Sequence, residues 1–356
     1  MRTSVKISVL MAGIILMACS QKKESHRVAI NKAIENPIVE NDSNNVTFEN
    51  RSVVFITGYD TGSKTYYTDA KEYFASQDVE IVDSAYSLQE MLLWLNINYN
   101  DKPYSEIHIV SNNKWTELPL ETIIKGERVN AQSIQEIISS GALPALNSNV
   151  LQPTSKLIFH ASNLGSNMSL LDGFKQAFST EVSPTVVAAE MVSVFGGEFT
   201  SHYLAKPYYT FYPTANSPGR VDLAKQFKKA YSNAEVDWLS VMNNQTERYQ
   251  GDIYSYKFNI PLNYEIDFES DEEIPNFNST EDLRAWMKDN EKISKDLEVL
   301  GIPLDKFRLY ETVRNETLII KGKVTVVCVL EPVMNPAYPS DYMIPTIENL
   351  RLYNKL

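Results

Sequence analysis

The chain contains 356 residues, of which 43% are hydrophobic and 11% aromatic, a composition typical of globular proteins. Its formal net charge of −12 argues against nucleic acid as a partner, because phosphate backbones attract basic surfaces. The two cysteines exclude a disulfide scaffold, and no cysteine or histidine pattern has zinc-binding spacing. We therefore expect no metal site and no cofactor.

The first 19 residues have the organisation of a secretion signal. Arg2 and Lys6 flank the start of an apolar stretch, residues 7–17, that is too short to span a bilayer comfortably. It ends in Leu16-Met-Ala-Cys19, which resembles the lipobox of bacterial lipoproteins. That resemblance implies removal of residues 1–18 as a signal peptide and lipidation of Cys19. The alternative is an ordinary secretory signal that happens to contain a cysteine.

A lipidated Cys19 would place the protein in the bacterial cell envelope, with the membrane as its partner through the lipid anchor. Ser20 follows the cysteine, and a residue other than aspartate there favours the outer membrane by the sorting habit of such lipoproteins. Residues 19–50 are rich in Asn, Glu, Lys and Ser and have little hydrophobic periodicity, so we expect them to form a flexible tether.

From residue 51 onward, short apolar runs alternate with amphipathic segments. The runs predict strands at 52–57, 79–83, 106–110, 156–160 and 185–189, with helices predicted at 65–76, 88–97, 131–140 and 169–179. Ser87 and Glu90 predict a capping box at the start of the second helix. This alternation indicates an α/β domain over residues 51–249, with a mainly parallel sheet covered by helices on both faces.

The remainder of the chain changes character. Long strand-like runs at 254–268 and 318–330 enclose a helical segment at 280–293, so we expect an α+β extension over residues 250–356. Cys328 lies inside the second run, between valines, and is expected to be a buried structural thiol.

A glycine-rich turn, Gly58 to Thr65, follows the first strand and precedes a helix, which is the setting of a phosphate-binding loop. The spacing differs from that motif, because Ser63 and not a glycine stands before Lys64. We therefore expect an ordinary strand-to-helix turn.

Polar residues follow the third and fourth predicted strands, where ligands gather in open α/β sheets. One set is Asn112 and Asn113, and the other is His160, Ala161 and Ser162. The order of elements over residues 52–195 resembles the caspase/gingipain-type fold, including the bacterial CHAT peptidases. In that family a turn after the third strand supplies a catalytic histidine, and a turn after the fourth supplies a nucleophilic cysteine.

The resemblance would align Asn112 with the histidine and Ala161 with the cysteine. An amide is no general base and a methyl group is no nucleophile, so the site is expected to have lost its cysteine-peptidase activity. The expected function is then binding of a peptide or an envelope protein in a cleft formed by Asn112, Asn113, His160, Ala161 and Ser162.

Alternatives remain at this stage. Ser162 could serve an active peptidase or esterase with a histidine from elsewhere in the chain, or the protein could be purely structural. A generic flavodoxin-like sheet is the alternative fold. His108 alternates with isoleucines and is expected to be a satisfied, partly buried strand residue, whereas no partner is evident for His202. An aromatic cluster is expected to consist of packing residues, with a carbohydrate or peptide groove as the alternative; its members are Tyr203, Tyr208, Tyr209, Phe211 and Tyr212.

Overall fold

The structure is a computed structural model that describes residues 51–356 except 63, 78, 113–117 and 213–217. These residues form two compact units. The α/β unit contains the described residues up to Lys206 together with Tyr249–Asp252 and Pro332–Leu356. The hairpin unit contains Pro207–Arg248 and Ile253–Glu331. The expected signal peptide, Cys19 and the tether lie outside the described residues.

The α/β unit is built on a sheet whose described strands have the order β13-β5-β4-β3-β1-β2. Neighbouring strands among β1, β2, β3, β4 and β5 are parallel, whereas β13 is antiparallel to β5. The strands are β1 (Arg51–Ile56), β2 (Glu80–Val82), β3 (Tyr104–Ser111), β4 (Leu151–Ala161), β5 (Thr185–Ala189) and β13 (Tyr353–Lys355). Parallel neighbours require crossover connections, which the intervening helices provide.

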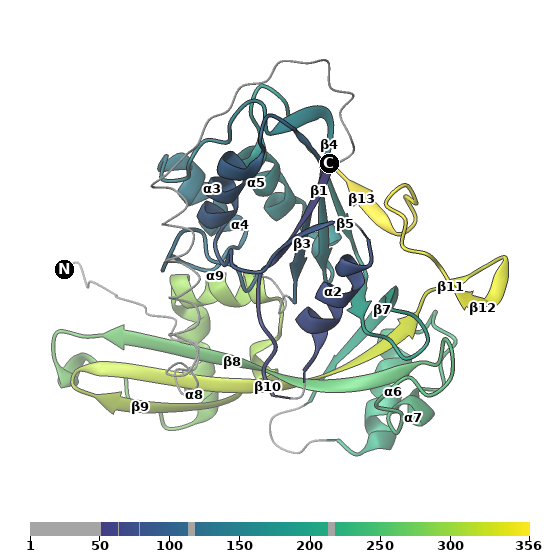
Figure 1. The fold of residues 1–356 in the computed structure, drawn as a ribbon. Coiled ribbons are helices and arrows are strands. Elements are labelled where there is room, and N and C mark those ends of the chain that lie inside the picture. The colour runs from purple at the N-terminus through teal and green to yellow at the C-terminus, as the bar shows by residue number, and fades with distance from the viewer. Residues whose placement is uncertain (1–50, 63, 78, 113–117, 213–217) are drawn as a thin grey trace. The chain divides into compact units, whose positions relative to one another are not determined.

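Helices cover both faces of this sheet (Figure 1). They are α2 (Tyr66–Ala75), α3 (Leu88–Asn98), α4 (Ala131–Ser139) and α5 (Met168–Phe178). Side chains alternate between the faces of a strand, so Val54 and Ile56 pack with Phe74 of α2, whereas Phe55 joins the core of the other three helices. The predicted α/β class, with a mainly parallel sheet between two helical layers, is confirmed.

Local signals set the boundaries of these elements. Ser87 accepts a hydrogen bond from the Glu90 backbone N–H at 3.1 Å and begins α3, as expected. The Glu90 carboxylate in turn accepts from the Tyr86 backbone N–H and the Ser87 hydroxyl, both at 2.9 Å. Two donors near the helix start are therefore satisfied by one buried carboxylate.

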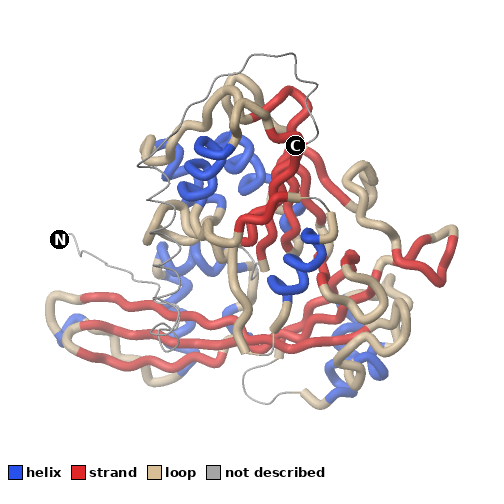
Figure 2. The backbone as a smooth tube through the Cα atoms, in the orientation of Figure 1, coloured by secondary structure: helices blue, strands red, loops and turns tan. Residues whose placement is uncertain are grey.

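The sequence patterns missed several short strands of the α/β unit. β6 (Val192–Phe195) pairs antiparallel with the first residues of β7 (His202–Phe211). β11 (Met334–Asn335) and β12 (Tyr338–Tyr342) form a small hairpin, and a short 3₁₀ turn, η1 (Leu164–Ser166), follows β4. Figure 2 shows these strands in red among long tan loops.

The hairpin unit is organised around two long antiparallel strands. β8 (Tyr254–Asp267) pairs with β10 (Thr317–Pro332), and β9 (Arg308–Arg314) pairs with the other edge of β10. The predicted helix at 280–293 is two helices, α8 (Thr280–Asp289) and α9 (Glu291–Leu300), because Asn290 caps α9 with its side chain. Two further helices, α6 (Arg220–Ala230) and α7 (Trp238–Val241), pack with Val327 and Val329 of β10.

The division of the chain differs from the expected boundary at residue 250. Residues 207–248 belong to the hairpin unit, because Tyr208 and Trp238 share a core with Val327 and Val329. The last 25 residues, from Pro332, return to the α/β unit, where β13 adds to the edge of β5. No helix among the described residues is long and apolar enough to cross a membrane.

Candidate functional site

The ends of β3 and β4 lie side by side, as the caspase-like alignment requires. Their parallel register pairs Ser111 with Ala161. Asn112 follows directly, and its backbone N–H donates to the Tyr67 hydroxyl of α2 at 3.0 Å. Asn113, the next expected cleft residue, lies outside the described residues. Asn112 therefore follows directly on the residue opposite Ala161, at the same edge of the sheet.

The remaining expected cleft residues do not share one surface. Ala161 is buried in the core beneath α3, α4 and α5, together with Phe159. His160 is one residue earlier in the strand and therefore points to the opposite face, beneath α2. It is 7% exposed, its ring lies 5.2 Å from that of Phe74, and its carbonyl accepts from the Tyr66 hydroxyl at 3.1 Å. His160 is thus an interior residue and does not line the mouth of an open cleft.

The loop after β4 is fixed by its neighbours. Ser162 is half-buried, and Asn163 has a left-handed backbone with φ of 57° whose N–H donates to the Met191 carbonyl at 3.2 Å. A Cβ on Gly165 would lie 2.7 Å from the Ala188 carbonyl oxygen, so only glycine fits this close approach to β5. A ligand at the strand ends would meet a preformed loop.

In the turn after β1, a carboxylate occupies the start of α2. The Asp60 carboxylate accepts from the backbone N–H groups of Tyr67 and Thr68 at 3.1 and 2.8 Å. These N–H groups, which have no partner within the helix, are therefore satisfied by a carboxylate of the chain itself. That carboxylate would repel a phosphate. The Tyr67 ring also fills the space beside Gly58, where a Cβ would lie only 2.4 Å from the ring.

Three histidines, two of them buried and His108 partly buried, form a cluster on the α2 face of the sheet, which the sequence reasoning missed. Nδ1 of His108 lies 3.0 Å from Nε2 of His160, and the ring centroids of His160 and His202 are 5.5 Å apart. One nitrogen of the first pair must donate and the other accept, so these two rings cannot both be protonated at this contact. Phe195 stacks on His202 with a centroid distance of 4.4 Å.

The register contains a signal that could have predicted this cluster. His108 pairs with Ile158 and Val110 with His160 on adjacent parallel strands, so both histidines occupy the same face, two residues apart. The alternation along one strand predicts the partly buried, satisfied state of His108, which is confirmed, but not the contact between histidines of two strands.

Burial keeps the inner histidines neutral. It lowers the pKa of His160 well below its usual value, and the neighbouring histidines lower it further. The pKa of His202 falls to about 3 for the same two reasons. At the outer end, His108 lies 3.5 Å from the Glu106 carboxylate. The hydrogen bond from His108, helped by Lys156, lowers the pKa of Glu106 to about 2.

This cluster offers no obvious catalytic or metal chemistry. No group of three or more His, Cys, Asp or Glu residues in the described part of the chain is arranged to hold a metal ion. Ser193 and His202 do form a serine–histidine pair, with Oγ and Nε2 2.9 Å apart. Both residues are buried, and Nδ1 of His202 has no hydrogen-bond partner in the described structure, so the orienting carboxylate of a catalytic triad is missing.

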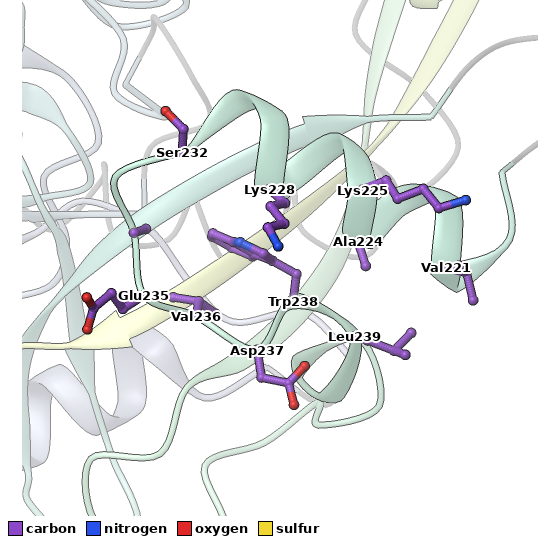
Figure 3. A pocket seen from close by; sticks show the side chains of 11 residues that line it. Val221, Ala224, Lys225, Lys228, Ser232, Glu235, Val236, Asp237, Trp238 and Leu239 are labelled. Carbon is purple, nitrogen blue, oxygen red and sulfur yellow. The ribbon is translucent and has the colours of Figure 1, made fainter.

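The hairpin unit has a separate surface groove with a volume of about 550 Å³ (Figure 3). It lies between α6 and the segment 232–239, with Trp238 on its floor and Lys228 beside the indole ring. The indole stacks on Phe227 at 5.2 Å. The charged lining residues include Lys225, whose ammonium pairs with Asp222 at 3.1 Å. The groove is open and its polar groups do not converge, so it ranks below the strand ends as a candidate site.

The expected packing role of two further features is observed. Tyr203 and Tyr208 are buried, Tyr208 packs with Trp238, and the Tyr208 hydroxyl donates to Glu331. Cys328 is fully buried, and burial raises the pKa of its thiol to about 12, so it is not a reactive thiolate.

Comparison of the chain with protein-family models, with curated proteins and with solved structures returned no match.

Proposed function

We propose that this protein is a lipid-anchored lipoprotein of the bacterial envelope whose α/β unit is a non-catalytic, caspase-like binding domain. The anchor is Cys19, in the lipobox-like sequence Leu16-Met-Ala-Cys19. The bound species is a peptide or a protein segment at the ends of β3 and β4.

One observation carries the proposal. The ends of β3 and β4 are adjacent, with Ser111 opposite Ala161, and in the caspase-like alignment Asn112 and Ala161 occupy the positions of the base and the nucleophile. Those side chains cannot cleave an acyl bond by the mechanism of that family. The position still offers the side chain of Asn112 and the half-buried Ser162 for hydrogen bonding.

The geometry of the loop favours binding over mere scaffolding. Gly165 is held against β5, and its carbonyl accepts from the Asn354 side chain at 3.0 Å. A fixed loop loses little conformational entropy when a ligand binds, which increases affinity. A purely structural protein would have no requirement for this arrangement at the ligand-binding edge of the sheet.

The anchor is tested by metabolic labelling with a palmitate analogue. The wild-type chain should incorporate the label, and Cys19→Ala should not. Equal labelling of both chains would place the lipid elsewhere or reject the lipoprotein assignment.

The binding site is tested with an array of random peptides presented to the full chain. Asn112→Ala and Ser162→Ala should each lower the affinity for the best-binding peptides by about tenfold, because each removes about one well-formed hydrogen bond. Leu239→Ala, in the groove of the hairpin unit, is the matched control and should leave the affinity unchanged. Peptide binding that survives both strand-end variants would reject this site.

A hydrolase using Ser162, or the Ser193–His202 pair, is the competing function. A fluorophosphonate probe should leave the native chain unlabelled. Labelling that disappears in Ser162→Ala or Ser193→Ala would replace the binding function with hydrolysis.

A further inference from the structure

One face of the sheet in the hairpin unit is basic, although the chain as a whole carries a net charge of −12. The register of β10 places Lys321 opposite Tyr310 and Lys323 opposite Arg308, while Arg314 lies opposite Thr317. Directly paired residues of antiparallel strands project from the same face. Arg308, Arg314, Lys321 and Lys323 therefore form what we call the basic sheet face.

This face is open because the helices α8 and α9 lie against the other one (Figure 1). The alternate residues of β8 and β10, such as Tyr264, Leu318 and Ile320, are buried, as are Leu283 and Met287 of α8. By contrast, the four cationic residues of the basic sheet face are all exposed.

Within the part of the chain that the structure describes, the four cations are not neutralised. None of them forms a hydrogen bond or an ion pair with any other described residue through its side chain. Two carboxylates share the face, and that of Asp267 accepts a hydrogen bond from the Thr317 hydroxyl at 2.8 Å. Unpaired lysines and arginines that are grouped on one exposed face of a sheet indicate a surface that attracts anions.

Two features extend this surface. Tyr310 stands among the cations and is 55% exposed, and an aromatic ring with a polar tip is favoured at a membrane–water boundary. At the other end of the sheet, α6 packs over Val327 and Val329, which lie on the same face as Lys321 and Lys323. That helix adds the exposed residues Lys228 and Lys229.

We propose that the basic sheet face rests on the anionic phosphate surface of the bilayer that carries the lipid anchor. This inference depends on the proposed lipidation of Cys19, which would keep the folded units close to one bilayer. The net charge alone predicts repulsion from an anionic membrane, but the segregated charges let one face bind while the acidic remainder points away. An acidic protein partner could also bind such a face, but the anchor supplies a membrane at high local concentration.

The test uses the lipidated, full-length mature chain in vesicles. One set contains phosphatidylcholine alone, and the other contains about one third phosphatidylglycerol at about 0.1 M salt, where the Debye length is about 10 Å. Lysines are labelled with an amine-reactive reagent and quantified by mass spectrometry. Lys288 of α8 and Lys292 of α9 are the matched controls, since both are exposed on helices that cover the opposite side of the same sheet.

Labelling of Lys321 and Lys323 should fall by about fivefold or more in the phosphatidylglycerol vesicles. A change of this size corresponds to the binding free energy that one cation gains at an anionic surface. The control lysines should keep their labelling. The protection should disappear in high salt, and the double variant Arg308→Gln/Lys323→Gln should reduce the protection of Lys321. Equal labelling in both vesicle types, or equal protection of the controls, would overturn the proposal.

Two further arms separate the alternatives. Protection by inorganic phosphate with neutral vesicles would assign the face to a free anion, and protection only after adding an acidic protein would assign it to a protein partner. Both results overturn the membrane proposal. A chain that floats with neither vesicle type would show instead that the lipid anchor, and with it the proposed function, is wrong.

Discussion

At the scale of single residues, the histidine cluster is the feature with the clearest energetic consequence. His160 and His202 are buried among aromatic rings, and no carboxylate among the described residues pairs with them, so protonating either would place a charge in an apolar interior. Glu106 lies 3.5 Å from His108, the histidine at the outer end of the cluster, and also pairs with Lys156. The chain therefore keeps two imidazoles neutral at a pH where an exposed histidine would start to ionise.

Acidification should destabilise the protein through these residues. An unfolded histidine has a pKa of about 6.5, whereas the folded value for His202 is about 3. Between these values the unfolded state binds the extra proton, so stability is complete above pH 6.5 and falls as the pH decreases, by up to about 1.4 kcal/mol per pH unit for each such group. Urea unfolding between pH 7.5 and 5 measures this slope.

The variant His202→Phe should make that slope shallower. It keeps an aromatic ring against Phe195 and loses the hydrogen bond to Ser193, at a cost of about 1 kcal/mol at pH 7.5. Glu291→Gln, in α9 of the hairpin unit, is the control, because a carboxyl whose pKa lies below 4.5 changes stability only below that pH. Parallel pH profiles for the wild type and His202→Phe would reject this assignment.

At the scale of secondary-structure elements, helix starts show how local chemistry sets the fold. Ser87 caps α3 with its hydroxyl, whereas Thr65 stands at the same position of α2 without a side-chain hydrogen bond. Asp60 provides that function for α2 from the preceding turn. The two helices therefore depend on different residues.

Ser87→Ala should lower the free energy of unfolding by about 1–2 kcal/mol, because the buried Glu90 also loses a hydrogen-bond donor. Thr65→Ala is the matched control and should cost only a few tenths of a kcal/mol, since no cap is lost. Denaturant unfolding of the two variants compares them directly, and equal losses would contradict this account of the caps.

Gly165→Ala tests the approach of the strand-end loop to β5. The new Cβ would lie within 2.7 Å of two backbone atoms of β5, and backbone atoms cannot rotate away. We expect a loss of about 1–3 kcal/mol and weaker binding at the strand ends. Gly219→Ala meets no atom within 4 Å and should cost about 0.5–1 kcal/mol, the difference between glycine and alanine at a helix start. A Gly165→Ala chain with the melting temperature of the wild type would contradict the packing argument.

The elements that could be predicted from the sequence are those with local signals. β5 begins and ends where its apolar run does, and α3 starts at the expected cap. β13 has three residues and exists only because β5 offers an open edge, so no local pattern indicates it. β6 was missed in the same way, and with it Ser193, the hydrogen-bond partner of His202. The strand ends were located correctly, but the burial of His160 depends on Phe74 and Phe195, whose positions follow from tertiary packing.

At the scale of the whole molecule, the chain leaves the α/β unit and later returns to it. Leu352 and Tyr353 are buried in that unit, and the backbone groups of Val186 and Leu356 exchange hydrogen bonds at 3.1 and 2.9 Å. The C-terminal residues therefore complete the sheet that begins at β1. A division at residue 250, which the change in sequence character suggests, would separate β13 from its partner.

A fragment of residues 51–249 should consequently fail to fold stably. It lacks Leu352 and Tyr353, each of which contributes about 1.5–3 kcal/mol by burial, and it leaves the edge of β5 open to other chains. It also retains Tyr208 and Trp238 without the valines of β10 that cover them. Circular dichroism and size-exclusion chromatography should show loss of cooperative melting and aggregation, compared with a monodisperse 51–356 chain. If the shorter fragment melted cooperatively as a monomer, residues 51–249 would be a true domain, and the last strand of the sheet would be dispensable.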